Sequence, residues 1–113
     1  MRMWMVDPSL MCDRHLMGEH VECHILVGSL QKGRSISGFI KKDLLEPSSL
    51  ISRHERLAQE MLYRGFNHKS VLPEFSLEGL PEKEKLNKID IFKSHKELKS
   101  RCSRCRKLGE RKN

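Results

Sequence analysis

The sequence predicts a small all-α domain of three to four helices, with a short N-terminal arm packed on the core. Its 113 residues are the usual size of one domain with one hydrophobic core. Apolar residues recur at helical spacing in several segments, and no segment alternates as a strand does. No internal repeat, membrane-spanning run or secretory signal is apparent, so we expect a soluble protein inside the cell.

The first helix is predicted to run from about Pro8 to about Gln31. Asp7 directly precedes Pro8. This pair favours a helix start because Asp caps free N–H groups, while proline at the first position loses no hydrogen bond. The arm before it, residues 1–6, carries Trp4, the only tryptophan. If Trp4 is buried, it fixes the arm against the core.

A second helix is predicted over residues 49 to 64, where Leu50, Leu57 and Met61 repeat at helical spacing. Gly65 followed by Phe66 is typical of a left-handed helix cap with its apolar contact. Between the two helices we expect a basic loop and then, at 39–42, a loop or short irregular stretch.

The last part of the chain is predicted to hold one or two charged helices between Pro81 and about Arg101. The apolar residues expected to point inward from them are Leu86, Ile89, Phe92 and Leu98. We therefore expect a helical domain over residues 1–101, followed by a basic C-terminal tail over residues 102–113.

The charge balance favours a polyanionic partner. Twenty-two basic and 15 acidic residues leave a net charge of +7. Residues 98–113 hold seven of the basic residues against one acidic residue, so this segment carries most of the excess. Nucleic acid is the first candidate, although a solvated basic tail without a specific role gives the same pattern.

Four cysteines without a secretory signal indicate reduced thiols or a metal site rather than a disulfide framework. Cys102 and Cys105 have the spacing of half a zinc site. The other half would have to come from Cys12, Cys23 or a histidine, and buried inert thiols explain the pattern equally well.

Two constellations lie on the first helix. His20, Cys23 and His24 fall within one turn, and histidines four residues apart can bind one metal, although ordinary imidazoles on a helix face are favoured here. His15, Glu19 and Glu22 share another stripe, beside Gly18. They form either a polar notch or a solvated helix face.

Residues 14–22, Arg-His-Leu-Met-Gly-Glu-His-Val-Glu, resemble the signature helix of the phage pyrimidine dimer DNA glycosylases, the UV-repair endonuclease V family. In that family His-Leu-Met-x-Glu-x-x-Glu follows a short N-terminal arm. Residues 64–67, Arg-Gly-Phe-Asn, resemble a second family motif, and residues 32–34 lie where the family has a basic, glycine-containing loop. The resemblance covers about residues 1 to 67.

The resemblance implies a DNA glycosylase with abasic-site lyase activity that needs no cofactor and no metal. The nucleophile would be the α-amine of Met1, and the essential acid would be Glu22. We expect Met1 to remain on the chain, because the bulky Arg2 beside it prevents ordinary removal of the initiator methionine. The implied partner is damaged double-stranded DNA, bound by a monomer in the cytoplasm of a bacterial or phage-infected cell, at its nucleoid. The expected DNA-binding residues are Arg2, Arg14, His15, Lys32, Arg34 and Arg64.

The sequence departs from the family pattern beside the catalytic acid, where Val21 and Ile25 replace two arginines. An aromatic-rich C-terminus is also missing, so a lesion other than a pyrimidine dimer would suit the same chemistry. Two other functions stay open. One is a non-catalytic nucleic-acid-binding module with zinc at Cys102 and Cys105, and the other is a metal-dependent hydrolase using His20 and His24.

Overall fold

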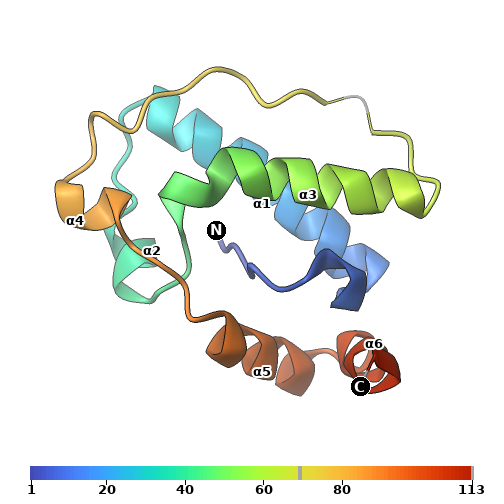
Figure 1. Cartoon of the computed structure of the whole chain (residues 1–113). Helices are drawn as coiled ribbons and strands as arrows, with labels where there is room; N and C mark the ends of the chain where they lie inside the picture. The colour runs from blue at the N-terminus through green and yellow to red at the C-terminus, as the bar shows by residue number, and fades with distance from the viewer. Residues whose placement is uncertain (69, 113) are drawn as a thin grey trace.

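The computed structural model describes residues 1–68 and 70–112, and within this part it contains helices and no strand. The elements in chain order are η1 (Pro8–Leu10), α1 (Asp13–Gln31), α2 (Ser37–Lys41), η2 (Pro47–Ser49), α3 (Leu50–Tyr63), α4 (Glu82–Lys85), α5 (Ile91–Arg101) and α6 (Ser103–Lys112). The longest are α1, α3, α5 and α6, which confirms the predicted all-α class. As Figure 1 shows, α1 and α3 cross on one side of the molecule, and α5 and α6 lie on the other.

Helix α1 ends at Gln31 as predicted, but it begins at Asp13 rather than at Pro8. Residues 8–10 form the separate 3-10 turn η1, whose first N–H groups Asp7 caps by accepting from the Ser9 N–H at 3.0 Å. The chain is extended at Met11 and Cys12 before α1 starts. This break allows the side chains of Met11 and Cys12, two adjacent residues, to be buried together.

Helix α3 and its cap confirm the prediction for residues 49 to 64. The helix buries Leu50, Leu57 and Met61, and α1 packs against it. Gly65 adopts a φ of +89°, which favours glycine. The Phe66 N–H then donates to the Met61 carbonyl at 2.9 Å, closing the helix end.

Residues 39–42 were predicted to be a loop or a short irregular stretch, but residues 39–41 belong to α2. Its first hydrogen bond runs from the Phe39 N–H to the Ile36 carbonyl at 3.0 Å. Ile36 is fully buried, and Phe39 and Ile40 pack against the core. Phe39 and Ile40 thus give this five-residue helix a partly buried apolar side, next to the buried Ile36 at its N-cap.

The N-terminal arm is part of the core, as predicted. Met3, Trp4 and Val6 are all buried. The Met3 N–H donates to the Leu44 carbonyl at 2.8 Å, and the Ser94 hydroxyl donates to the Trp4 carbonyl at 2.6 Å. The arm therefore lies between the α1–α3 pair and α5 (Figure 1).

In the C-terminal part, two of the four inward-pointing predictions are wrong. Ile89 and Leu98 are buried, whereas Leu86 is 63% exposed and Phe92 is 85% exposed. The reason is that α4 ends at Lys85 and Asp90 caps a new helix by accepting from the Lys93 N–H, so no single helical period spans this region. On α5 the inward face is set by Ser94 and Leu98, and Phe92 points away from it.

The basic C-terminal segment forms α6, which contacts α5 and η1. Cys105 and Gly109 on this helix are buried. None of the helices described is both long and apolar enough to cross a membrane.

Leu98→Ala should lower the free energy of unfolding by about 2–5 kcal/mol, because it opens a cavity in a fully buried site. Leu86→Ala is the matched control, since the same side-chain atoms are removed from an exposed position, and it should change stability by less than about 0.5 kcal/mol. Urea denaturation followed by circular dichroism measures both. Equal losses in the two variants would contradict the packing of α5.

Candidate active site

A cleft of about 270 Å³ lies between the N-terminal arm and one face of α1. The arm contributes Arg2 and Trp4. The helix contributes the stripe predicted from spacing, His15, Glu19 and Glu22, together with its neighbours Arg14 and Gly18. Gly18 has open space where a side chain would begin. The cleft can therefore admit a polar group against the helix backbone.

Glu19 is held in a buried ion pair. The Arg53 guanidinium donates to both carboxylate oxygens, at 2.6 and 2.9 Å, and the two side chains are almost completely buried. This contact joins α1 to α3 through the floor of the cleft. Because both oxygens already accept charged hydrogen bonds, Glu19 is a poor candidate for proton transfer.

Glu22 is only half-buried. Among the ion pairs of residues 1–68 and 70–112, none includes Glu22 or the Met1 amine. Met1 itself packs partly buried against the core and directly precedes the cleft residue Arg2. The start of the chain and Glu22 therefore belong to the same region, without direct ion pairing between them.

The two arginines of the cleft differ in their freedom. Arg2 donates to Glu97 of α5 at 2.6 Å, and its guanidinium lies 3.7 Å from the centre of the Trp4 ring. The hydrogen bond from Arg2 lowers the pKa of Glu97. Arg14 is exposed, and its positive charge adds to burial in lowering the pKa of His15. Unlike Arg2, Arg14 takes part in none of the ion pairs of the described residues.

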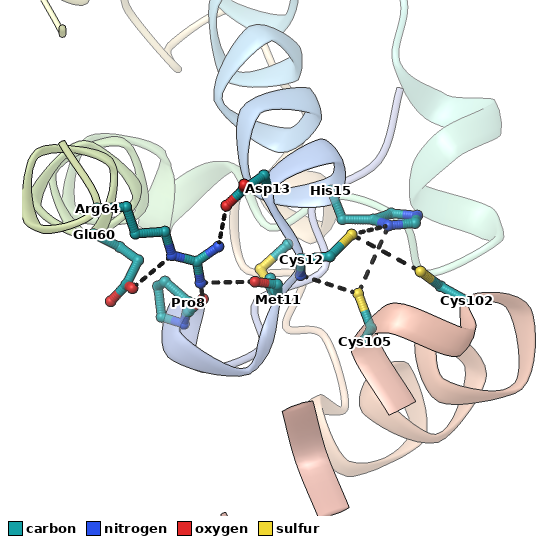
Figure 2. Close-up of polar contacts among 9 residues, drawn as sticks. All are labelled: Pro8, Met11, Cys12, Asp13, His15, Glu60, Arg64, Cys102 and Cys105. Carbon is teal, nitrogen blue, oxygen red and sulfur yellow. Dashed lines mark hydrogen bonds and ion pairs between the residues drawn. The ribbon is translucent and has the colours of Figure 1, made fainter. Parts of the chain in front are cut away.

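Arg64, also expected to bind DNA, has its donors occupied within the fold (Figure 2). It donates to Glu60 at 2.8 Å and to Asp13 at 2.9 Å, and also to the carbonyls of Pro8 and Met11 at 3.0 and 2.7 Å. These contacts fix the break between η1 and α1 against the end of α3. Arg64 thus connects these segments within the fold, and its predicted contact with DNA stays a prediction.

Lys32 and Arg34 are exposed in the loop after α1 and do not line the cleft. Lys32 follows His15 by 17 residues, which is about 25 Å along a helix axis. The predicted DNA-binding role of both residues therefore concerns a surface outside this cleft.

Cys12, His15, Cys102 and Cys105 meet in one cluster (Figure 2), and His15 also lines the cleft. The His15 Nδ1 lies 3.3 Å from the Cys12 sulfur and 3.7 Å from the Cys105 sulfur, and the sulfurs of Cys12 and Cys102 are 3.8 Å apart. Sequence analysis left the partners of the C-terminal pair open. The fold supplies Cys12 and His15 and leaves Cys23, the other buried candidate, outside this cluster.

A second cluster contains four histidines, of which sequence analysis found only His20 and His24. Helix α3 adds His54, and the segment after it adds His68. The Nε2 atoms of His20 and His68 are 2.7 Å apart, and those of His54 and His24 are 3.2 Å apart. Burial and the neighbouring imidazoles lower the pKa of His20 to about 4 and also lower that of His54. The histidines of α1, of α3 and of the segment after α3 are far apart in the sequence, so no spacing pattern predicted this cluster.

The fold and the cleft define a helical protein in which the buried N-terminal arm and the first helix form a site that contains both arginines and carboxylates. The family model described as pyrimidine dimer DNA glycosylase matches residues 1–73. The chain therefore belongs to the pyrimidine dimer DNA glycosylase family, which implies a DNA substrate. Comparisons with curated proteins and with solved structures gave no significant match.

Glu19→Gln should lower the free energy of unfolding by roughly 3–5 kcal/mol, because it leaves the buried Arg53 guanidinium without its counter-charge. Glu22→Gln, one turn along the same helix face, should leave stability nearly unchanged. Urea denaturation of both variants tests the difference. A stable Glu19→Gln variant would show that the α1–α3 contact does not depend on this ion pair.

Acidification below pH 6.5 should destabilise the protein. Since the fold lowers the pKa of His20 from 6.5 to about 4, the neutral imidazole is favoured in the native state. Stability should therefore be full above pH 6.5 and fall as the pH is lowered towards 4. Thermal melts in reductant and chelator measure it, and His24→Gln should make the fall smaller. A constant melting temperature across this window would contradict the prediction.

Proposed function

We propose that this chain is a DNA glycosylase with abasic-site lyase activity, in which the α-amine of Met1 is the nucleophile and Glu22 is the acid–base residue. The observation that carries the proposal is the shared cleft, which the arm that begins with Met1 and the half-buried Glu22 form together. The family match includes both residues.

An α-amine suits this role because its ordinary pKa is about 7.7–8.0, against about 10.4 for lysine. A substantial fraction is therefore free base near neutral pH. The nitrogen attacks C1′ of the damaged nucleotide, and the base leaves with the electrons of the glycosidic bond. Loss of a proton from the nitrogen and opening of the sugar give an imine.

The lyase step then follows from the imine. A base removes a proton from C2′, the electron pair of that bond forms a C2′–C3′ double bond, and the 3′ phosphate leaves from C3′. Water hydrolyses the imine and restores the amine. The strand is cut, and each step uses only the amine, water and one proton-transfer group.

Glu22 is the carboxylate of the cleft that can transfer that proton. Glu19 has both oxygens committed to Arg53, whereas Glu22 takes part in none of the ion pairs of the described residues. As an anion, Glu22 also stabilises the positive charge that develops on the sugar. For this role, the Glu22 carboxylate needs to lie within about 3 Å of the reacting atoms of the Met1 amine and of the bound DNA.

Binding of DNA is proposed to use Arg14 and His15 at the cleft, with Lys32 and Arg34 further along α1. Arg2 would contribute after exchanging Glu97 for a phosphate. Val21 and Ile25, beside Glu22, are 53% and 49% exposed. An apolar flank suits an unstacked base better than a phosphate, so we propose that damaged pyrimidines, above all pyrimidine dimers, are extruded against this side.

Borohydride trapping tests the proposal. Incubation of untagged protein with duplex containing a pyrimidine dimer or an abasic site, followed by reduction, should give a covalent adduct that peptide mapping places on Met1. Acetylation of the α-amine should abolish the adduct while DNA binding persists. If the acetylated protein still forms the adduct, a lysine is the nucleophile.

Glu22→Gln should reduce strand incision by about 10²–10⁴-fold, because the proton-transfer group is lost. DNA binding measured by fluorescence anisotropy should remain. Glu82→Gln, which removes an exposed carboxylate on α4, is the matched control and should retain full incision. Full activity of Glu22→Gln would exclude it as the acid–base residue.

The competing functions give different products. A metal-dependent hydrolase at the histidine cluster would cut strands without any borohydride-trapped adduct. A non-catalytic binding module would bind DNA and leave it intact. The β-elimination proposed here leaves an unsaturated aldehyde at the 3′ end of the upstream fragment and a 5′ phosphate on the downstream fragment, which mass spectrometry distinguishes.

A further inference from the structure

The thiols and imidazole that meet beside the cleft form a complete metal-ligand set. Cys12 and His15 come from the start of α1, and Cys102 and Cys105 come from the junction of α5 and α6. These two pairs are separated by about 90 residues of chain, so only tertiary packing brings them together. We propose that this cluster is a structural zinc site.

The distances between the ligand atoms fit one tetrahedral ion. With Zn–S bonds of about 2.3 Å and Zn–N bonds of about 2.0–2.1 Å, a tetrahedron has S–S edges of about 3.8 Å and S–N edges of about 3.5 Å. The Cys12 and Cys102 sulfurs are 3.8 Å apart, and the two sulfur distances to the His15 Nδ1 are 3.3 and 3.7 Å. All the candidate ligand atoms lie within 4.8 Å of one another.

The surroundings of the sulfurs also suit bound thiolates. The Cys12 N–H donates to the Cys105 sulfur at 3.3 Å. At Cys102, burial opposes ionisation, but hydrogen bonds from the backbone at Cys105 and Arg104 contribute to a lowered pKa of the thiol. Such N–H donors spread the negative charge of a thiolate that ligates a metal. The segment Cys102-Ser103-Arg104-Cys105 thus supplies two sulfur ligands together with backbone groups that hydrogen-bond to the Cys102 sulfur.

Two metal-free explanations compete with zinc. Hydrogen-bonded thiols satisfy the same distances, and Cys12 could form a disulfide with Cys102. The first leaves Cys105 as a buried neutral thiol, since burial raises its pKa to about 12. The second uses two of the four ligands and gives no reason for His15 and Cys105 to meet them. Zinc accounts for all four side chains, and three thiolates with one imidazole fill its coordination, which is typical of a structural site.

Zinc at this point would connect the family-matched part of the chain to the part beyond it. The match ends at residue 73, whereas Cys102 and Cys105 lie further along. Helix α5, which ends at this cluster, carries Ser94 and Glu97, the partners of Trp4 and Arg2. By fixing α5 and α6 on α1, the ion would fix the arm that precedes the cleft.

His15 would then serve two regions. Zinc bound at Nδ1 leaves the ring proton on Nε2, so this nitrogen becomes a donor. His15 also lines the cleft with Glu22 and meets Trp4 edge to face at 5.9 Å between ring centres. The zinc site thereby sets the tautomer of a cleft residue, independently of whether the proposed glycosylase chemistry is correct.

Metal analysis of the full chain tests the proposal. Protein purified without a tag in reductant and zinc, then dialysed, should hold one zinc per chain. Cobalt(II) in its place should give the visible bands of a tetrahedral ion and a thiolate charge-transfer band. Cys102→Ser and Cys105→Ser should lose the metal and that band, whereas Cys23→Ala, which removes the cysteine outside the cluster, should keep both.

A measurement on the unaltered protein covers the case in which a variant does not fold. Bound zinc should slow alkylation of Cys102, the half-buried member of the cluster, and chelator should restore it, as peptide mass spectrometry can follow. Zinc-free protein whose thiols all titrate as free would overturn the proposal. So would a Cys12–Cys102 disulfide that persists in protein purified in reductant and zinc, or a metal that survives both serine variants and is lost on His54→Gln.

Discussion

The ion pair between Glu19 and Arg53 is the contact on which the rest of the structure depends. Both side chains are buried, and the guanidinium meets both carboxylate oxygens, so the pair fixes α1 against α3 in position and in rotation. That rotation turns Glu22 towards the N-terminal arm and His20 towards α3. The pair also occupies both oxygens of Glu19, one of the two carboxylates of the helix stripe, so Glu22 is the remaining carboxylate of the cleft.

The arm is held from the opposite side by a part of the chain beyond the family match. Ser94 binds the Trp4 carbonyl, and Glu97 binds Arg2, which stacks on Trp4. A terminal segment of six residues would fray without such contacts. The C-terminal helices therefore support a cleft whose walls come entirely from residues 2 to 22. This division explains how a short sequence motif can depend on distant helices for its geometry.

Much of the site could be predicted because its residues are close in sequence. His15, Glu19 and Glu22 share a face by helical spacing alone, and the predicted cap of α3 follows from the local chemistry of Gly65. The partners of these residues could not be predicted. Nothing in the spacing of Arg53 or Glu97 indicates an ion pair with Glu19 or Arg2, and the break at Met11 and Cys12 needs Arg64 to bind the freed carbonyls.

The sequence by itself determined the all-α class, the helix stripe with its two carboxylates and the half-set of thiols at Cys102 and Cys105. These features depend on local periodicity, capping and residue chemistry, which act over a few residues. Only the tertiary structure decided which carboxylate stays available, that Phe92 faces outward, and that Cys12 and His15 join the C-terminal thiols while His54 and His68 join His20. The physical reason is that burial and charge pairing depend on how helices from distant parts of the chain pack together. The spacing of residues within one segment does not indicate that packing.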